Sequence, residues 1–322
     1  MKRITTILMT GLLLGLVVSG CSKSKQGQKR FVVAFSQCNN AEPYRAAQNQ
    51  LMQKLFYEKG DVQLVIADAQ QDNSKQIAQI ETFIRQKPDL LIVAPNERAP
   101  LTQIMGRAIA AGIPVICLER DITEPNYTTF VGADNLAIGR MAGELIVDEL
   151  TKRKGKAQGK IVEMRGLLGV EAEMERYKGA HDVLKSHPDI KVVHEAVADW
   201  LQSNARERMN EILRSQPEID VVYAHNDPMA IGAYLAAREL GRDENTIFIG
   251  VDGLGGPAGG LKKVQDGVLT GTFYYPLCVD KAVEVGYRML TEPGFKPEKK
   301  YVLEPKLVTA QNAAEMYEKF TF

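Results

Sequence analysis

The chain has 322 residues, which is enough for two α/β lobes of ordinary size. Lysine plus arginine equals aspartate plus glutamate at 40 each, so nothing in the net charge favours nucleic acid or an anionic membrane surface as a partner. Hydrophobic residues make up 45% and charged residues 25%, a mixture typical of a folded globular protein and not of a disordered one.

The N-terminus has the pattern of a secretory signal peptide over residues 1–20. Lys2 and Arg3 precede an apolar run, and small residues follow it up to Cys21. The run of about 15 apolar residues is shorter than the roughly 20 that a membrane-spanning helix needs. The sequence VSGC, which ends at Cys21, resembles the processing box of bacterial lipoproteins. This resemblance implies cleavage before Cys21 and a lipid on that cysteine, with simple secretion as the alternative.

Residues 21–30 are mostly polar and are expected to form a tether between the lipid and the folded domain. The remaining cysteines, Cys38, Cys117 and Cys278, lack the spacing of a disulfide framework or a zinc site, which favours buried free thiols. The four histidines show no ligand spacing either, so we expect no metal and no cofactor.

From Phe31 onward, short β-branched runs alternate with segments of helical length. Helices are expected at 43–59, 73–87 and 99–111, and later at about 135–153, 172–186, 202–215, 227–240 and 277–291. The predicted strands fall into two consecutive sets: 31–35, 62–67, 89–94, 113–118 and 128–133, then 160–164, 190–198, 219–225, 247–252 and 269–275. Strands and helices that alternate at this spacing predict βαβ units, and hence an α/β protein with two Rossmann-like lobes built on parallel sheets.

Polar and aromatic residues follow many of these strands. In open parallel sheets, ligands bind beyond the carboxyl ends of the strands, and two such ends that face each other would form a cleft. The candidate binding residues at strand ends are Gln37, Glu42, Tyr44, Arg45, Glu119, Arg120, Trp200, Asn226, Asp252 and Tyr274.

This set of side chains suits a hydroxylated ring. Carboxylates and amides accept hydrogen bonds from adjacent hydroxyl groups, and the arginine fork donates them. An aromatic ring packs on the C–H face of a sugar. A phosphorylated ligand is disfavoured because no glycine-rich phosphate loop precedes a helix of the first lobe.

Six motifs resemble the ribose-type (type 1) periplasmic sugar-binding proteins, and the likeness is greatest to the galactofuranose-binding branch. They are FSQ (35–37) with YRAA (44–47), ADN (133–135), GRMAGE (139–144), YAHNDPMAIGA (223–233) and GVDG (250–253). The resemblance implies that Tyr44 and Trp200 sandwich the sugar. It also implies that Arg45, Arg120 and Arg176 donate to its oxygens.

In the same resemblance, Glu119, Asn226 and Asp252 accept hydrogen bonds from the ligand. Glu119 stands where the family usually has aspartate. The two tyrosines Tyr274 and Tyr275 stand where relatives have glutamine or glutamate. Both departures bear on which sugar binds.

The resemblance also implies a hinge in which the chain crosses three times between the lobes, near 133–134, 275–276 and 303–304. The N-terminal lobe would then comprise 31–133 plus 276–303, and the C-terminal lobe 134–275 plus 304–322. Closure of the hinge around the ligand would turn binding into a signal. We expect a monomer whose only link to the membrane is the lipid.

The functional expectation is a periplasmic lipoprotein that captures a pentose or hexose, in pyranose or furanose form, for the membrane permease of an ABC importer. A sugar sensor that presents its closed form to a membrane protein is the alternative.

Enzymes are more remote alternatives. Gly253, Gly255 and Ala258 match a loose dinucleotide fingerprint, but Tyr274 and Tyr275 stand where the ribose-binding acid belongs, and a turn with Pro257 beginning a helix fits better. A glycosidase would need a protonated carboxyl group, and Glu119 beside Arg120 should stay ionised. A repressor is excluded because a helix-turn-helix segment would stand where the export signal lies.

Overall fold

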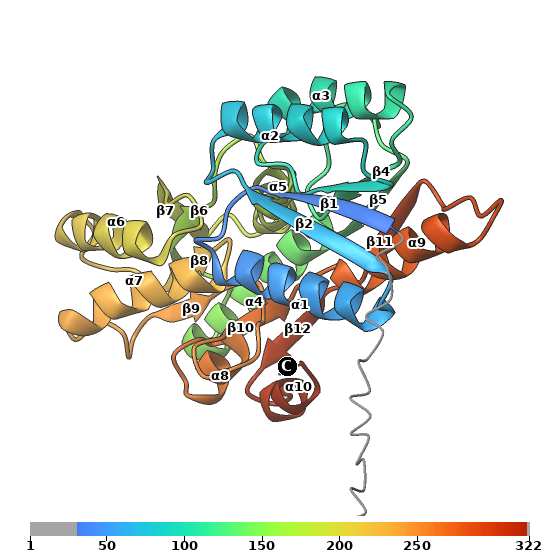
Figure 1. The fold of residues 1–322 in the computed structure, drawn as a ribbon. Helices are drawn as coiled ribbons and strands as arrows, with labels where there is room; N and C mark the ends of the chain where they lie inside the picture. Colours follow the sequence, from blue (N-terminus) through green and yellow to red (C-terminus); the bar gives the residue numbers. More distant parts are fainter. Residues whose placement is uncertain (1–30, 321–322) are drawn as a thin grey trace, which may run out of the picture.

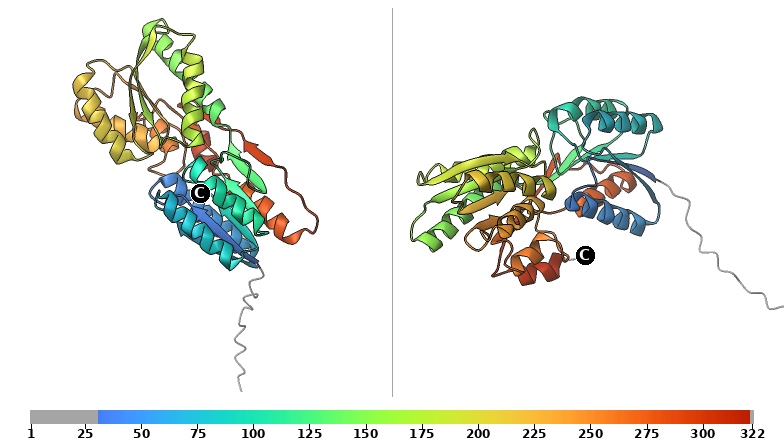
Figure 2. Two further views of the ribbon diagram at one scale, coloured as in Figure 1. Left: turned by 90° about the horizontal axis from the view of Figure 1, so that it is seen from above. Right: turned by 90° about the vertical axis from the view of Figure 1, so that its left-hand side faces the viewer.

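Two six-stranded sheets organise the chain, and the computed structural model describes residues 31–320 (Figure 1). The first sheet has the order β11-β5-β4-β3-β1-β2 and the second the order β12-β10-β9-β8-β6-β7. Figure 2 shows the two sheets in separate lobes that lie side by side, each with helices on both faces of its sheet. The two-lobed α/β fold predicted from the alternation of strands and helices is confirmed.

The strands of the first sheet are β1 (Phe31–Gln37), β2 (Val62–Asp68), β3 (Leu90–Val93), β4 (Val115–Leu118), β5 (Thr129–Ala133) and β11 (Lys300–Leu303). Those of the second are β6 (Gly159–Arg165), β7 (Ile190–Val197), β8 (Val221–Ala224), β9 (Ile247–Ile249), β10 (Gly271–Tyr274) and β12 (Lys306–Thr309). All neighbouring strands pair in parallel except β10 and β12, which are antiparallel.

The ten helices of the described residues join these strands. They are α1 (Pro43–Lys59), α2 (Asn73–Gln86), α3 (Arg98–Ala110), α4 (Asn135–Lys154), α5 (Glu171–Leu184), α6 (Gln202–Ser215), α7 (Asp227–Glu239), α8 (Gly260–Gln265), α9 (Val279–Thr291) and α10 (Ala313–Phe320). Side-chain oxygens of Asp72, Asp134 and Asn226 cap three of them by accepting from free backbone N–H groups of the first turn.

The two lobes share the same sheet topology. Without its last strand, each sheet has the doubly wound order 2-1-3-4-5, so the strand order reverses beside β1 in one lobe and beside β6 in the other. Ligands bind at such switch points, outside the carboxyl ends of the strands. The central strands are buried on both faces: β3 and β4 have no exposed residue, because helices cover both sides of the sheet.

The chain passes between the sheets after β5, after β10 and between β11 and β12. Helix α9 packs against α1, which belongs with the first sheet. These placements support the predicted division into 31–133 plus 276–303 and 134–275 plus 304–322, and we keep that division as a proposal.

Two strands, β11 and β12, were not predicted from the sequence, and the helix α8 was predicted with the wrong start. The two strands lie at sheet edges and are only partly buried, so they carry no continuous apolar run. The expectation that Pro257 begins a helix was wrong. Gly256 turns the chain with a φ of +84°, and α8 starts only at Gly260, as a helix of six residues.

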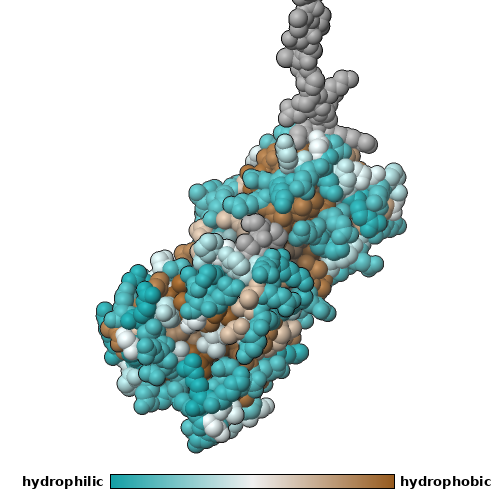
Figure 3. Space-filling model, turned by 90° about the horizontal axis from the view of Figure 1, so that it is seen from below, coloured by the Kyte–Doolittle hydropathy of each residue, from teal (hydrophilic) through white to brown (hydrophobic). Residues whose placement is uncertain are grey.

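Cys38, Cys117 and Cys278 are free and buried, as predicted. None of the helices within residues 31–320 is long and apolar enough to cross a bilayer. Hydrophilic residues dominate the face drawn in Figure 3, and the hydrophobic ones show in patches between them. The signal peptide, the tether and Cys21 lie outside the described residues.

Candidate ligand-binding site

A small polar cavity lies between the lobes, among residues that follow the carboxyl ends of both sheets. Its free volume is about 10 Å³, because the side chains that line it lie close together in this structure. Its lining is charged, amide-bearing or aromatic, with one small apolar residue: Glu42, Tyr44, Arg45, Glu119, Arg120, Ala172, Arg176, Trp200, Asn226, Asp252 and Tyr275. The structure therefore brings together all the predicted binding residues except Gln37 and Tyr274.

Gln37 stands behind the cavity wall. It is the last residue of β1, and its Nε2 donates to Gln48 Oε1 at 3.3 Å and to Asn49 Oδ1 at 3.1 Å. Gln48 Oε1 also accepts from Arg45 Nη1 at 3.0 Å. Gln37 thus holds in place the side chain that orients Arg45.

Tyr275, and not Tyr274, faces the cavity. The Tyr275 hydroxyl donates to Glu119 Oε1 at 2.9 Å, and its ring centroid lies 5.3 Å from that of Tyr44. The Tyr274 ring instead stacks on Phe320 at 3.8 Å. Adjacent residues of an extended chain point to opposite sides. Because β10 ends at Tyr274, the residue that follows the strand is Tyr275, and sequence reasoning missed it by one position.

The first lobe contributes a buried ionic cluster. Arg45 Nη1 lies 2.6 Å from Glu119 Oε2, and Arg120 Nε lies 3.6 Å from the same oxygen. Glu42 Oε1 lies 3.8 Å from Arg120 Nη2. Burial by itself would raise the pKa of Glu119, but the guanidinium groups of Arg45 and Arg120 outweigh it and hold the pKa below its usual value. Glu119 is therefore an ionised acceptor, as the sequence predicted.

Several buried donors of this cavity make no hydrogen bond with the described residues. They are Arg45 Nε, Arg120 Nε and Trp200 Nε1, on side chains that are at most 3% exposed. A buried donor without a hydrogen bond costs about 1–3 kcal/mol. Donors without hydrogen bonds on lining residues of both lobes suit a ligand that carries several acceptor oxygens.

Aromatic and cationic groups surround the same space. The guanidinium carbon of Arg120 lies 5.6 Å from the Trp200 ring, and that of Arg176 lies 5.8 Å from this ring and 4.6 Å from the Tyr275 ring. Arg176 Nε donates to Asn135 Oδ1 at 3.0 Å, which fixes its orientation. Tyr44 is anchored through its hydroxyl, which donates to the carbonyl of Pro276 at 2.6 Å.

Asn226 and Asp252 come from the ends of β8 and β9. Asn226 Oδ1 caps α7, and its Nδ2 donates to the carbonyl of Trp200 at 3.0 Å, which ties the tryptophan loop to α7. Next to it, the buried Asp227 accepts from Gly253 N at 2.8 Å and from Thr272 Oγ1 at 2.6 Å. Burial and the neighbouring Asp227 carboxylate raise the pKa of Asp252 well above its ordinary value.

Backbone strain is concentrated at the cavity. Glu119, Trp200 and Asp252 have φ angles of +68°, +70° and +124°, a region that side-chain-bearing residues rarely adopt. Such conformations cost about 1–3 kcal/mol each and cluster at functional sites. Each aims a cavity-lining side chain from a strand end into the space between the lobes.

Buried groups behind the cavity support it. Glu163 binds two histidines, with 2.7 Å from Oε2 to His181 Nε2 and 3.0 Å from Oε1 to His225 Nε2. The carbonyl of His225 accepts from Arg176 Nη1. His225 thus links Glu163 to the cavity-lining Arg176.

Gly166 supplies the room that the Trp200 ring occupies. A Cβ atom at Gly166 would lie 2.2 Å from the indole ring, so Gly166→Ala should displace the ring. We expect this variant to weaken binding of the cognate ligand about 10-fold or more, measured by titration calorimetry. Gly106→Ala in α3 is the control, since its Cβ would meet only the end of the Asn126 side chain, at 3.3 Å. Equal affinities for the two variants would contradict this role of Gly166.

A two-lobed α/β fold with a polar cavity at facing strand ends defines a solute-binding protein of the periplasmic type, and residues 33–291 match the family of periplasmic binding protein domains. The chain belongs to this family, in its ribose-type branch. It is 30% identical to the ribose import binding protein of Bacillus subtilis over 79% of this chain and 82% of that protein. It is 31% identical to the galactofuranose-binding protein of Escherichia coli, over 81% and 80% of the two chains.

Solved structures of periplasmic binding proteins have the same fold as this chain. The chain resembles the fructose-binding periplasmic domain of a hybrid two-component system, with a TM-score of 0.84 and 37% identity over 90% of this chain and 94% of that one. It also resembles a galactofuranose-binding protein, with a TM-score of 0.83 and 29% identity over 90% and 98% of the two chains.

Proposed function

We propose that the protein captures one neutral monosaccharide, a pentose or hexose, in the cavity between its lobes. The observation that carries this proposal is the set of buried donors on Arg45, Arg120 and Trp200 that make no hydrogen bond with the described residues. The relatives support it, since their names describe them as binding ribose, galactofuranose and fructose. A furanose ring is included because an arabinose-binding relative holds arabinofuranose.

The residues would divide the recognition between them. Tyr44 and Trp200 would cover the C–H faces of the ring, since both are buried aromatic side chains of the lining. Arg45, Arg120 and Arg176 would donate to ring and hydroxyl oxygens, and Glu119 and Asp252 would accept from hydroxyl groups. The Asn226 amide already makes hydrogen bonds to the Trp200 carbonyl and to the first turn of α7. We therefore assign Asn226 to holding Trp200 in place as well as to contacting the ligand.

We propose binding without chemistry, because the relatives are named as binding proteins. Asp252 lines the cavity with a raised pKa, and we assign it to hydrogen bonding with the sugar. Hydrolysis of a glycoside needs a protonated carboxyl group beside the scissile bond. Glu119 is held ionised by two arginines. Asp227, whose pKa burial raises to about 7, accepts from Thr272 and Gly253 and does not line the cavity.

For the partner, we propose the permease of an ABC importer in the membrane, since relatives are named as ribose import binding proteins and as part of an arabinose ABC transporter. A membrane sensor is the second candidate. It is favoured by the likeness to the periplasmic domain of a hybrid two-component system at 37% identity. In both cases closure of the lobes around the sugar would be the recognised state.

We further propose that the protein works in the periplasm as a monomer that is anchored by a lipid on Cys21. Cys21→Ala is expected to abolish incorporation of labelled palmitate in bacteria, because a thioether-linked lipid needs that sulfur. Cys117→Ala, which removes a buried thiol of β4, should label like the parent. Continued labelling of Cys21→Ala would overturn the anchor.

The experiment that tests sugar binding is a thermal-unfolding screen of the mature domain against pentoses and hexoses, with furanose-rich sugars included. A ligand at about 100 times its Kd adds about 2.7 kcal/mol to the free energy of unfolding. One sugar with a clear shift in Tm would support the proposal and name the substrate. No shift with any sugar would contradict it.

A further inference from the structure

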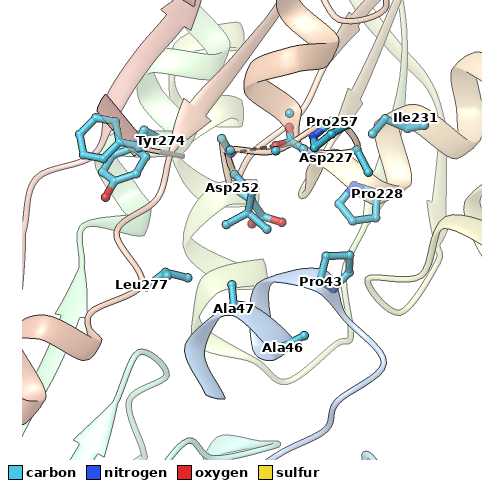
Figure 4. A pocket seen from close by; sticks show the side chains of 18 of the residues that line it. Pro43, Ala46, Ala47, Asp227, Pro228, Ile231, Asp252, Pro257, Tyr274 and Leu277 are labelled. Atoms are coloured by element: carbon cyan, nitrogen blue, oxygen red, sulfur yellow. Dashed lines mark hydrogen bonds between the residues drawn. The ribbon is translucent and has the colours of Figure 1, made fainter. Parts of the chain in front are cut away.

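A second and larger hollow lies beside the sugar cavity. We call it the vestibule; it is bounded by α1 of the first lobe and by residues 253–260 of the second. It has a volume of about 630 Å³. Figure 4 shows Pro43, Ala46 and Ala47 on α1 at one side of this space and Pro228, Ile231 and Pro257 opposite them.

Helix α1 separates the two spaces. Pro43, Ala46, Ala47 and Gln50 have the spacing of one helix face and line the vestibule. Tyr44 and Arg45, on the neighbouring face of the same turn, line the sugar cavity. One helix therefore presents small, mostly apolar residues to the vestibule and its aromatic and charged residues to the sugar.

Glycines make up much of the wall opposite α1. Gly253, Gly255, Gly256, Gly259 and Gly260 line the vestibule and place no side chains in it. A Cβ atom at Gly256 would meet nothing within 4 Å. Gly256 therefore leaves space open at this wall, whereas Gly253, Gly259 and Gly260 are required by packing, since a Cβ atom there would come within 2.7 Å of Tyr274, Leu254 or Asp227.

The chemistry of the lining selects the occupant. Proline, alanine, leucine, isoleucine and the stacked pair of Tyr274 and Phe320 make up most of it. Among the described residues that line the vestibule there is no lysine, arginine or histidine, and Asp227 and Asp252 are acidic. An anionic group is disfavoured. The polar side chains that could serve a second sugar are five of the twenty lining residues: Gln50, Gln202, Asp227, Asp252 and Tyr274. An uncharged apolar group fits.

Asp252 connects the two spaces, because its side chain lines both of them. Figure 4 shows Asp252 between α1 and the loop, where it projects into the vestibule. A sugar hydroxyl that bonds to Asp252 would lie at the boundary between the polar cavity and the apolar vestibule.

We propose that the vestibule is a second subsite, which takes an alkyl or aryl substituent carried on the sugar oxygen next to Asp252. The natural ligand is then a glycoside or an ether of the monosaccharide, and not only the free sugar. This inference rests on the proposed function, since the ring in the polar cavity positions the substituent. A volume of about 630 Å³ falls within the range of roughly 300–1,000 Å³ for sites that hold small organic ligands in apolar surroundings.

The test uses the sugar identified by the thermal screen. Methyl and benzyl derivatives are made at each hydroxyl oxygen of the sugar in turn, and their affinities for the folded domain are measured by titration calorimetry. At one position the benzyl derivative should bind about 10-fold tighter than the methyl derivative, because burial of the phenyl group removes apolar surface from water. Ala46→Trp, which fills the vestibule, should abolish this preference and keep the affinity for the free sugar. Ala110→Trp, at an exposed alanine of α3, should leave both unchanged.

The outcomes separate the two proposals. If the free sugar binds but no benzyl derivative binds better than its methyl counterpart, the vestibule is only the edge of the cleft and the inference is overturned. The same holds if Ala46→Trp keeps the benzyl preference while it binds free sugar normally. If no free sugar binds the parent protein at all, the proposed function fails, and the subsite fails with it.

Discussion

Trp200→Ala is expected to weaken sugar binding by about 2 kcal/mol or more, which is roughly a 30-fold loss of affinity. The indole ring is 3% exposed, its Nε1 has no partner among the described residues, and the guanidinium groups of Arg120 and Arg176 lie within 6 Å of it. The change removes both an apolar face and a donor from the cavity. Titration calorimetry with the identified sugar measures the effect.

Trp200→Phe is the matched control for this prediction. It keeps an aromatic face and loses the donor, so we expect an affinity between those of the parent and the alanine variant. Trp200 also packs in the hydrophobic core of the second lobe, so the alanine variant should lose about 3 kcal/mol or more of folding stability. Binding is therefore compared at a temperature where both variants are folded. Affinity equal to the parent in Trp200→Ala would refute the placement of the sugar.

Arg120→Ala is expected to have an effect of similar size on binding, about 2 kcal/mol or more. Arg120 is 2% exposed, its Nε makes no hydrogen bond with the described residues, and its ion pairs with Glu42 and Glu119 hold its positive charge at the cavity wall. Its removal leaves Glu42 with one weaker ion pair, to Arg45 at 3.9 Å.

Arg120→Lys tests whether charge or geometry matters. Lysine keeps the positive charge but lacks the planar fork that bonds to two oxygens at once. We expect Arg120→Lys to recover less than half of the lost binding free energy. Calorimetry on the parent and both variants decides the point, and a lysine variant that binds like the parent would show that Arg120 contributes charge alone.

Much of the fold follows from local signals. The long helices begin and end within about two residues of their predicted bounds, because glycine, proline and capping side chains mark the turns. Strands β11 and β12 could not be found in this way. β11 pairs with β5 and β12 pairs with β10. These pairings form only when the C-terminal part of the chain comes back to each sheet, and no local sequence pattern indicates this.

The candidate site followed from one topological rule, that ligand groups stand after parallel strands. The rule located Glu119, Trp200, Asn226 and Asp252 without any knowledge of tertiary contacts. It failed by one residue at β10, because the end of a strand is fixed by its partners: Asp252 N bonds to the carbonyl of Phe273, and Tyr275 N bonds to that of Asp252. A shift of one position exchanges the two faces. Ala172 carries no polar signal, so only the structure could place it in the lining.

The measurement that tests the account most directly is the fluorescence of Trp200 during titration with the sugar that raises the Tm. Trp200 is the one tryptophan of the chain and lines the cavity, so its emission reports on this site alone. A saturable change in emission, with the same Kd as calorimetry, is the predicted result. Binding seen by calorimetry without any change in Trp200 emission would place the sugar elsewhere and contradict the account.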